Sequence, residues 1–489
     1  MILNSAKTIL FLCLASGLNF TASAQPKLTV NWDKQVIVSK TIPTLQVVVN
    51  PPLRRGASIH DASFKALKDL GCEYVRFVPW LPYPRLGVAE LEPPTDKTTS
   101  WDFSLIDPIT IDFLEATKGH SVILNFSTIP QWMYKTDKPV AYPTNPDSVT
   151  WNYEQGDKLV DSTGKQVADY FTRLYSWYTK GGFTDELGKK HTSGYHYAVP
   201  YWEVLNEPEF EHQTTPQEYT KIYDAVVNEM KKESPETKFV GMALAFETKP
   251  EWFEYFLDHM NHKPGVPMDM ISYHFYATEV VEPLDVIQYT YFARADGFLD
   301  RVRYIETIRK RLSPATRTTT DEIGSILANE EQPIPAEYWN LSGALFAYLY
   351  TELTKLGIDV VGESQLVGYP TQFPSVSMMN WKTGKPNARY WTLKLLKDNF
   401  GPGDIQTETK MEKDTNDAIV SQGFKTKNGD KILLVNKRNR SMTVTLPSSC
   451  KGKKISMVDV STGDNEAAVS VINSEAIELK PFAVAVIAN

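Results

Sequence analysis

Short apolar runs alternate with longer amphipathic stretches through most of the chain. The apolar runs include residues 121–126, 195–205, 238–243, 269–276 and 358–362, and the run 195–205 is closed by a turn signal. Runs of this kind are typical of buried parallel strands. The stretches between them have helical spacing and include 166–180, 216–232, 299–312 and 338–356. Strands that alternate with helices predict repeated βαβ units and a parallel sheet.

The pattern changes at Gly401. From there the apolar runs are short and separated by turns, as in 432–436, 442–446, 455–458 and 482–486, which is typical of an antiparallel β-sandwich. Near the other end, residues 28–32 are β-rich, and we expect them to pair with the C-terminal strands. The predicted domains are therefore a (β/α)8 TIM barrel over 45–400 and a β-sandwich over 401–489. We expect the N-terminal strands of 25–44 to become part of the β-sandwich.

The first 24 residues have the pattern of a secretory signal peptide. Lys7 is basic, residues 8–18 are mostly apolar, and Ala22-Ser23-Ala24 is a cleavage sequence. We therefore expect a mature chain that starts near Gln25 and is secreted or periplasmic. The alternative is a buried N-terminal strand. The apolar stretch is too short to span a bilayer, so we expect no membrane span.

Composition excludes several classes of function. The 489 residues carry a net charge of −8, which argues against a nucleic-acid surface. The eight histidines are scattered without metal-ligand spacing, and glycine-rich nucleotide loops are absent from the sequence, so we expect no metal and no cofactor. Cys72 and Cys450 remain after signal cleavage, and we expect free, buried thiols. The oligomeric state stays open.

One apolar run ends in a way that suggests chemistry. Residues 195–205 lead into Asn206-Glu207-Pro208, and Pro208 cannot donate to a strand ladder. An amide and a carboxylic acid therefore follow the carboxyl end of a buried strand, where parallel α/β enzymes hold their active sites. Glu209 and Glu211 come next, and we expect them to be solvated acids at the start of a helix.

A second acid follows a similar run. Thr318-Thr319-Thr320 lead into Asp321-Glu322, and Gly324 permits a sharp turn. Strand alternation predicts that Asp321 and Glu322 point to opposite faces. Glu322 lies 115 positions after Glu207, and at roughly 30 residues per strand–helix unit about three units fit between them. The two acids are thus predicted on strands four and seven of an eight-strand barrel.

Together with His274-x-Tyr276 and the β-rich tail, these motifs resemble clan A glycoside hydrolases. The closest likeness is family 39, which contains β-xylosidases and α-L-iduronidases, and it covers roughly residue 45 to the C-terminus. The resemblance implies a retaining reaction, with Glu207 as the acid/base and Glu322 as the nucleophile about 5–5.5 Å apart. It also implies that Asn206 bonds the sugar 2-hydroxyl.

The resemblance extends to three residues around the acids. A buried arginine needs a carboxylate partner, and Arg76 resembles the clan A arginine that holds the nucleophile. Its alternative is a structural ion pair elsewhere. The resemblance places the Tyr276 hydroxyl on the nucleophile and gives His274 a substrate-facing role. The alternative is a packed pair at the rim.

Three further residues are expected near the sugar. His60 is predicted at the rim of the first strand, and the indole of Trp132 near the cleft. Trp381 belongs to 380–386, which resembles the family's loop over the barrel mouth. Two long loops, 82–100 and 134–164, are expected to set specificity.

The sequence therefore predicts a secreted, retaining exo-glycosidase whose partner is a carbohydrate. The alternatives are an endo-acting clan A glycanase and a catalytically silent carbohydrate-binding barrel. A uronic acid substrate would need a basic clamp, for which Lys382, Lys385 and Arg389 are the candidates.

Overall fold

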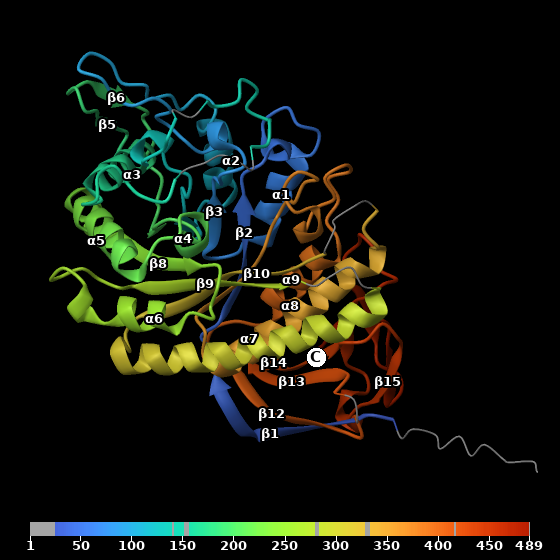
Figure 1. Ribbon diagram of the computed structural model, residues 1–489. Coiled ribbons are helices and arrows are strands. Elements are labelled where there is room, and N and C mark those ends of the chain that lie inside the picture. Colours follow the sequence, from blue (N-terminus) through green and yellow to red (C-terminus); the bar gives the residue numbers. More distant parts are fainter. Residues whose placement is uncertain are drawn as a thin grey trace, which may run out of the picture.

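A computed structural model describes residues 25–138, 141–150, 156–278, 283–327, 333–414 and 417–488. The predicted signal segment lies outside the described residues. The chain forms a closed barrel surrounded by helices and a separate antiparallel sheet that contains the C-terminal strands (Figure 1). This architecture confirms the predicted fold class.

The barrel consists of eight parallel strands, and β10 closes it by pairing with β9 on one side and β11 on the other. In chain order they are β2 (Ile42–Val48), β3 (Val75–Val78), β4 (Val122–Leu124), β7 (Tyr201–Glu203), β8 (Lys238–Leu244), β9 (Met270–Thr278), β10 (Arg317–Ile326) and β11 (Val360–Glu363). The strands are almost entirely buried, as expected for apolar runs in a parallel sheet covered by helices. Glu207 follows the fourth strand and Glu322 lies on the seventh, which confirms the predicted spacing.

Helices surround the strands. They are α1 (His60–Leu70), α2 (Asp107–Ala116), α3 (Lys165–Thr179), α4 (Pro208–Glu211), α5 (Pro216–Glu233), α6 (Pro250–Leu257), α7 (Leu284–Leu312), α8 (Ala336–Leu356) and α9 (Ala388–Asn399). Local signals explain several ends. Thr215 and Glu218 form a capping box at the start of α5, and Gly357 ends α8 in the left-handed region. A small hairpin of β5 (Gly182–Thr184) and β6 (Lys190–Thr192) follows α3.

Helix α7 is longer than its sequence pattern indicates. It begins at Leu284 instead of residue 299, and its N-terminal end lies beside the C-terminal sheet (Figure 1). There the backbone N–H of Asn439 donates to Oε1 of Gln288 at 2.7 Å, and its Nδ2 donates to Asp285 at 2.9 Å. The N-terminal half of α7 therefore connects the two parts of the molecule.

The second sheet has nine strands in the order β17-β16-β19-β14-β13-β12-β1-β15-β18. These are β1 (Lys27–Val38), β12 (Ile405–Glu412), β13 (Ile419–Thr426), β14 (Gly429–Asn436), β15 (Met442–Thr445), β16 (Lys454–Val458), β17 (Ala468–Val471), β18 (Ala476–Leu479) and β19 (Val484–Ala488). Strand β1 pairs with β12 in antiparallel register, so the N-terminal strand joins this sheet as expected. The sheet has its own apolar core, which includes Leu28, Leu434 and Ile487.

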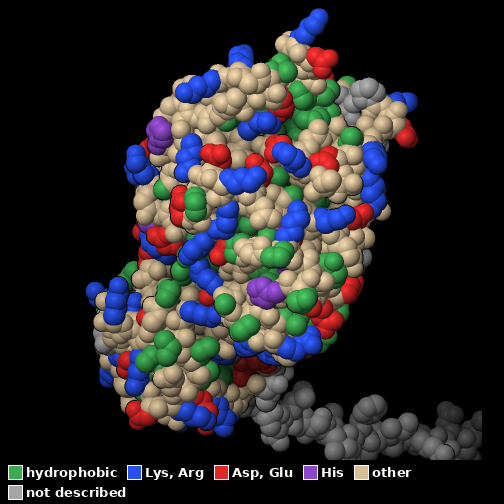
Figure 2. All heavy atoms as spheres, turned by 90° about the vertical axis from the view of Figure 1, so that its left-hand side faces the viewer, with side chains coloured by type: hydrophobic (Ala, Val, Ile, Leu, Met, Phe, Trp, Pro, Cys, Tyr) green, Lys and Arg blue, Asp and Glu red, His purple; other side chains and the backbone are tan. Residues whose placement is uncertain are grey.

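Cys72 and Cys450 are free and buried, as predicted, Cys72 in the barrel core and Cys450 in the core of the sheet. Figure 2 shows a face on which basic and acidic side chains are interspersed. None of the helices in the described ranges combines the length and the apolar character that a membrane crossing requires.

Candidate active site

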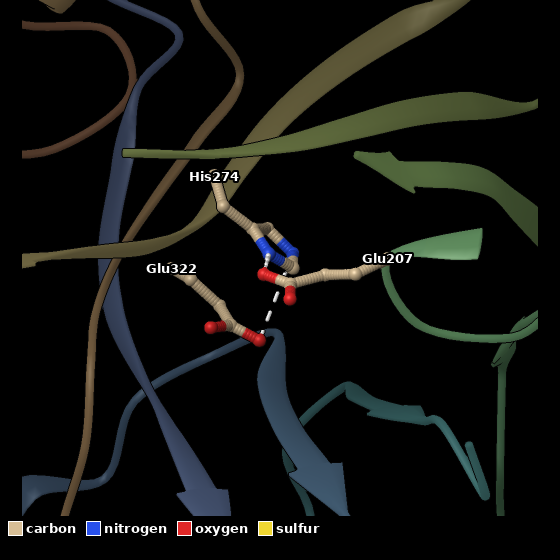
Figure 3. A group of neighbouring side chains, drawn as sticks. All are labelled: Glu207, His274 and Glu322. Carbon is tan, nitrogen blue, oxygen red and sulfur yellow. Dashed lines mark hydrogen bonds and ion pairs between the residues drawn. The ribbon is translucent and has the colours of Figure 1, made fainter. Parts of the chain in front are cut away.

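Glu207 and Glu322 converge from opposite sides of the barrel mouth (Figure 3). One side-chain oxygen of each acid, together with a ring nitrogen of His274, lies within 4.8 Å of the others. Glu207 stands just after β7, and its backbone is in the left-handed region with φ of 42°. Such a conformation is uncommon for a residue with a side chain and is concentrated at functional sites.

His274 lies between the two acids instead of on the wall that a substrate would face. Its side chain is buried, with Nδ1 2.8 Å from Oε1 of Glu207 and Nε2 3.6 Å from Oε1 of Glu322. Burial opposes a charge on the ring, but the carboxylates of Glu322, Asp321 and Glu207 outweigh it and hold the pKa of His274 well above its usual value. The ring therefore bridges the two acids, and its surroundings favour the protonated form.

Arg76 holds Glu322, as the family resemblance implies. This side chain is fully buried on β3, and its Nη1 donates to Oε1 of Glu322. Nη1 also donates to Oε1 of Gln46 at 2.9 Å. Burial alone would lower the pKa of Arg76, but the charges of Glu203, Asp321 and Glu322 raise it. A permanent positive charge therefore faces the proposed nucleophile.

The other oxygen of Glu322 is held by Tyr276. The tyrosine hydroxyl donates to Oε2 of Glu322 at 2.7 Å and lies 2.6 Å from Oγ of Ser364. Gly324 makes this approach possible, since a Cβ there would lie 3.1 Å from the Tyr276 ring. The sequence suggested a turn at Gly324, but β10 continues to Ile326. The glycine serves close packing.

Asp321 does not point away from Glu322, contrary to the expectation from strand alternation. Between Thr319 and Glu322, β10 advances by one residue more than β9, which is a β-bulge. Both acids therefore face the barrel interior, and Asp321 lies 3.6 Å from Nε of Arg76 and 3.5 Å from Nε2 of His274. Burial favours the neutral acid, but Arg76 and His274 lower the pKa of Asp321.

Glu203 is a further buried acid that contacts Arg76, the residue that also holds Glu322. It accepts hydrogen bonds from Nε of Arg76 at 2.5 Å, from Nδ2 of Asn125 at 2.7 Å and from Oγ of Ser272 at 2.5 Å. Burial, together with the nearby Asp321, raises the pKa of Glu203 to about 7 although Arg76 opposes this. Because Glu203 is partly neutral near pH 7, Arg76 is left to balance mainly Asp321 and Glu322.

Asn206 connects Arg76 to Glu211. Its Oδ1 accepts from Nη2 of Arg76 at 2.7 Å, and its Nδ2 donates to Oε1 of Glu211 at 2.9 Å. An arginine offers only donors, so the amide must present its oxygen to Arg76. Nε1 of Trp80 donates to the same oxygen of Glu211 at 2.7 Å. Glu211 thus fixes the amide that is expected to meet the sugar.

Glu209 and Glu211 are not solvated acids. Burial, reinforced by the charge of Glu207, holds the pKa of Glu211 well above its usual value. Burial likewise raises the pKa of Glu209 to about 7, and its Oε1 accepts from the backbone N–H of Phe246 at 2.8 Å. The tight turn at Glu207 directs α4 back onto the barrel, so acids that would be solvated on a free helix are enclosed.

The acids open into a cavity of about 840 Å³. Its polar lining includes Gln46, Asn206, Glu207, Glu211, Tyr276, Glu322 and Gln365, and its apolar lining includes Val48, Val78, Trp80, Phe210, Phe246, Phe275 and Phe373. Helix α7 contributes Arg294, Gly297 and Arg301. None of the described residues of 82–100 or 134–164 lines this cavity, so the wall expected from those loops comes partly from α7.

The structure places His60, Trp132 and Trp381 outside this cavity. His60 starts α1 and bonds Asp112 on α2 at 2.9 Å. Nε1 of Trp132 donates to the backbone carbonyl of Glu90 at 3.0 Å, and its ring lines a separate groove. The loop that carries Trp381 packs against the start of α1, where a Cβ on its Gly384 would lie 2.9 Å from Cβ of Ala62.

The three basic residues suggested as a clamp for a uronic acid do not come together at the cavity. Arg389 is fully buried and donates to Glu363 at 2.9 Å, while Lys382 and Lys385 are exposed and do not line the cavity. The lining residues that sequence reasoning missed include Gln46, Trp80 and Glu211. A polar residue inside an apolar run was the available signal for Gln46, but no pattern in the sequence distinguished Trp80 or Glu211.

The comparisons with known proteins agree with this geometry. The family model described as glycosyl hydrolases family 39 matches residues 20–319, which is more than half of the 489 residues. The match ends just before Glu322, so the position of that residue rests on the structure. Residues 417–487 match a second model, the C-terminal immunoglobulin-like domain of D-apionate lactonase. Among curated proteins none matches the chain.

Solved structures show the same fold. A GH51 arabinofuranosidase from Xanthomonas axonopodis pv. citri has a TM-score of 0.64 at 12% identity, with 95% of this chain and 99% of that chain covered. A GH30 endoxylanase from Clostridium papyrosolvens C71 has a TM-score of 0.58 at 13% identity, with 94% and 99% covered. A conserved exported protein from Bacteroides fragilis has a TM-score of 0.60 at 11% identity, with 94% and 99% covered. At these identities the similarity concerns the fold alone.

Proposed function

Because this chain belongs to family 39 of the glycosyl hydrolases, we propose that it is a retaining O-glycosidase with Glu207 as acid/base and Glu322 as nucleophile. The observation that carries the proposal is the approach of the two acids, whose nearest oxygens lie within 4.8 Å in one cavity. Retaining glycosidases hold their carboxyl groups about 5–5.5 Å apart, whereas inverting enzymes need about 6.5–9.5 Å to admit a water.

The first step forms a covalent intermediate. A carboxylate oxygen of Glu322 attacks the anomeric carbon, the bond to the leaving oxygen breaks, and the proton of Glu207 passes to that oxygen. Arg76 and Tyr276 donate to the two oxygens of Glu322, so they favour its ionised form before attack. The Nδ1 atom of His274 contacts Glu207 and keeps its carboxyl group oriented toward the cavity.

The second step releases the sugar. Formation of the ester removes the negative charge of Glu322, and Glu207, which has given its proton to the leaving group, is now a carboxylate. The Glu207 carboxylate then takes a proton from water, the water oxygen attacks the anomeric carbon, and the bond to Glu322 breaks. Two inversions return the original configuration.

A panel of nitrophenyl glycosides, uronides included, with the product anomer followed by NMR, tests the reaction class. We expect hydrolysis of at least one substrate with retention. Inverted products would contradict the double displacement. If the wild type hydrolyses none of the panel but binds sugars, and Glu207→Gln and Glu322→Gln bind them equally well, the chain is a carbohydrate-binding barrel instead.

Leaving-group chemistry separates the roles of the two acids. A dinitrophenyl leaving group departs without protonation, so Glu207→Gln should form the intermediate from it at nearly the wild-type rate and fail on poor leaving groups. Glu322→Gln lacks the nucleophile, so its rates on the dinitrophenyl substrate and on substrates with poor leaving groups should both fall by at least about 1000-fold. Equal losses for both substrates in Glu207→Gln would contradict its role as the acid.

We further propose exo action on terminal glycosyl residues. Helix α7 contributes to one wall of the cavity, and Phe373 and Val376 after β11 contribute to another, an arrangement suited to a chain end. Hydrolysis of a reduced, end-labelled oligosaccharide should release single sugars from the start. Early products of intermediate length would favour an endo-acting enzyme.

Secretion is part of the proposal. Ala22-Ser23-Ala24 precedes Gln25, and cleavage there would remove the segment ahead of β1. Expression of the full chain in a bacterial host, with N-terminal sequencing of the exported protein, should yield a chain that starts at Gln25. Retention of the uncleaved chain in the cytoplasm would contradict it.

A further inference from the structure

Two exposed phenylalanines line the cavity on the side of Glu207. Phe210 is 60% exposed and Phe246 is 42% exposed, and their rings meet edge to face with centroids 5.5 Å apart. Large apolar side chains that line a cavity and stay open to water are unfavourable unless something covers them, so they mark binding surfaces. The pair is therefore a candidate binding surface inside the cavity.

The backbone ties this pair to the acid/base. The N–H of Phe210 donates to the carbonyl oxygen of Glu207 at 2.9 Å, and the N–H of Phe246 donates to the Glu209 carboxylate at 2.8 Å. A proton from Glu207 goes to the leaving oxygen, so the leaving group must lie on the Glu207 side of the broken bond. Because Phe210 follows Glu207 by three residues and its ring contacts Phe246, we expect the aromatic pair to contact that group instead of the sugar that becomes attached to Glu322.

A charged pair lies beside the rings. Glu247 and Arg301 both line the same cavity. Nε and Nη2 of Arg301 both contact Oε1 of Glu247, at 2.6 and 2.5 Å. A guanidinium has five N–H donors and a carboxylate several acceptor positions, so this pair retains capacity for hydroxyl groups. An apolar surface flanked by donors and acceptors is complementary to a sugar ring, which has a face of C–H groups and an edge of hydroxyls.

We propose that Phe210, Phe246 and the Glu247–Arg301 pair form the subsite for the leaving group, and that this group is a second sugar ring. The inference rests on the proposed glycosidase activity and adds the substrate class, a glycoside whose aglycone is itself a sugar. A phenolic aglycone would use the aromatic pair but would leave the charged pair without a role.

Three substrates that share one glycone test the inference: a glycosyl fluoride, a nitrophenyl glycoside and a disaccharide. The fluoride has no ring to occupy the subsite. Phe210→Ala and Phe246→Ala should each lower kcat/KM on the disaccharide by about 10-fold, the size of one aromatic contact, and change it on the fluoride by less than about twofold. Phe246→Tyr keeps the ring and should retain activity on the disaccharide.

The charged pair distinguishes a sugar from a phenolic aglycone. Glu247→Gln and Arg301→Met should lower kcat/KM on the disaccharide by about 10-fold and leave the nitrophenyl glycoside within about twofold. Tyr304 is an exposed aromatic on α7 that does not line the cavity, so Tyr304→Ala is the control and should change nothing. Melting temperatures confirm that each variant is folded.

The outcomes are separable. The proposed subsite would be contradicted if kcat/KM of the variants falls equally on the disaccharide and the fluoride, or if it does not fall on the disaccharide. A fall in kcat/KM seen only with the nitrophenyl glycoside would contradict a sugar aglycone and indicate a phenolic one. If the wild type hydrolyses neither the fluoride nor any other substrate, the proposed function fails and the subsite falls with it.

Discussion

The hydroxyl of Tyr276 lies 2.7 Å from Oε2 of Glu322, and the packing of the Tyr276 ring against Gly324 allows this contact. The nucleophile is thereby held at both oxygens, by Tyr276 on one and by Arg76 on the other. Neither partner is near Glu322 in the sequence, so the barrel itself orients the carboxylate.

Gly324→Ala should impair catalysis without removing any catalytic group. The new Cβ would lie 3.1 Å from Cε1 of Tyr276, so the ring must shift and its bond to Glu322 must lengthen. We expect kcat to fall by about 10-fold, as for Tyr276→Phe, which corresponds to about 1.4 kcal/mol. Gly401→Ala, where a Cβ meets open space, is the control in the steady-state assay. Equal kinetics for the two alanine variants would contradict the role given to Gly324.

Arg76→Met should destabilise the fold as well as abolish activity. The substitution leaves Glu203, Asp321 and Glu322 buried without their main positive charge, and removing one partner of a buried ion pair costs about 3–5 kcal/mol. The stability of Arg76→Lys should lie between those of the wild type and Arg76→Met, because lysine keeps the positive charge but lacks the paired donors of the guanidinium. Urea unfolding measures both variants. Wild-type stability in Arg76→Met would show that these acids are neutral in the folded protein.

Glu211 is expected to act as a neutral acid that positions Asn206. Glu211→Gln keeps an acceptor for Asn206 and Trp80, so kcat/KM at pH 7 should stay within about threefold. Glu211→Ala removes the acceptor, and kcat/KM should fall by about 10-fold. Rescue of the alanine defect by glutamine separates this role from one that needs the charge.

The pH dependence of kcat/KM tests whether ionisation of Glu211 lowers activity. Because burial and the charge of Glu207 hold its pKa well above the usual range, the wild type gains a negative charge beside Glu207 only when the pH rises past that raised pKa, and activity should then fall. Glu211→Gln cannot gain that charge, so its kcat/KM should persist to higher pH. Superimposable alkaline limbs would contradict the prediction.

Stability should decrease as the pH rises through neutrality, partly because of Glu90. Burial raises the pKa of this carboxyl to about 8, against about 4.3 in an unfolded chain. The folded state therefore binds the proton more tightly, and this stabilisation is full below about pH 4.3 and is lost as the pH rises to 8. The slope contributed is at most about 1.4 kcal/mol per pH unit. Glu90→Gln should flatten the unfolding free energy across this range, and an unchanged slope would contradict the assignment.

The sequence by itself determined the class of fold and the two acids. Short apolar runs predicted the parallel strands, and the run that leads into Asn206-Glu207-Pro208 placed an acid after the fourth strand. These predictions succeeded because burial between helices demands apolar residues along the whole strand. Proline alone did not set the boundary, since β7 already ends at Glu203 and Pro43 lies inside β2. The change of pattern at Gly401 marked the second sheet for the same local reason.

Only the tertiary structure decided which other side chains surround those acids. Asp321 faces inward because β10 carries an extra residue relative to β9, and alternation along a single strand cannot reveal a bulge that is defined by its partner. Likewise, Glu211 is enclosed by Trp80 and Asn206, while the loops expected around the substrate give way to α7. Such contacts depend on how distant segments pack against one another. The sequence of one segment does not show which other segments lie next to it in the fold.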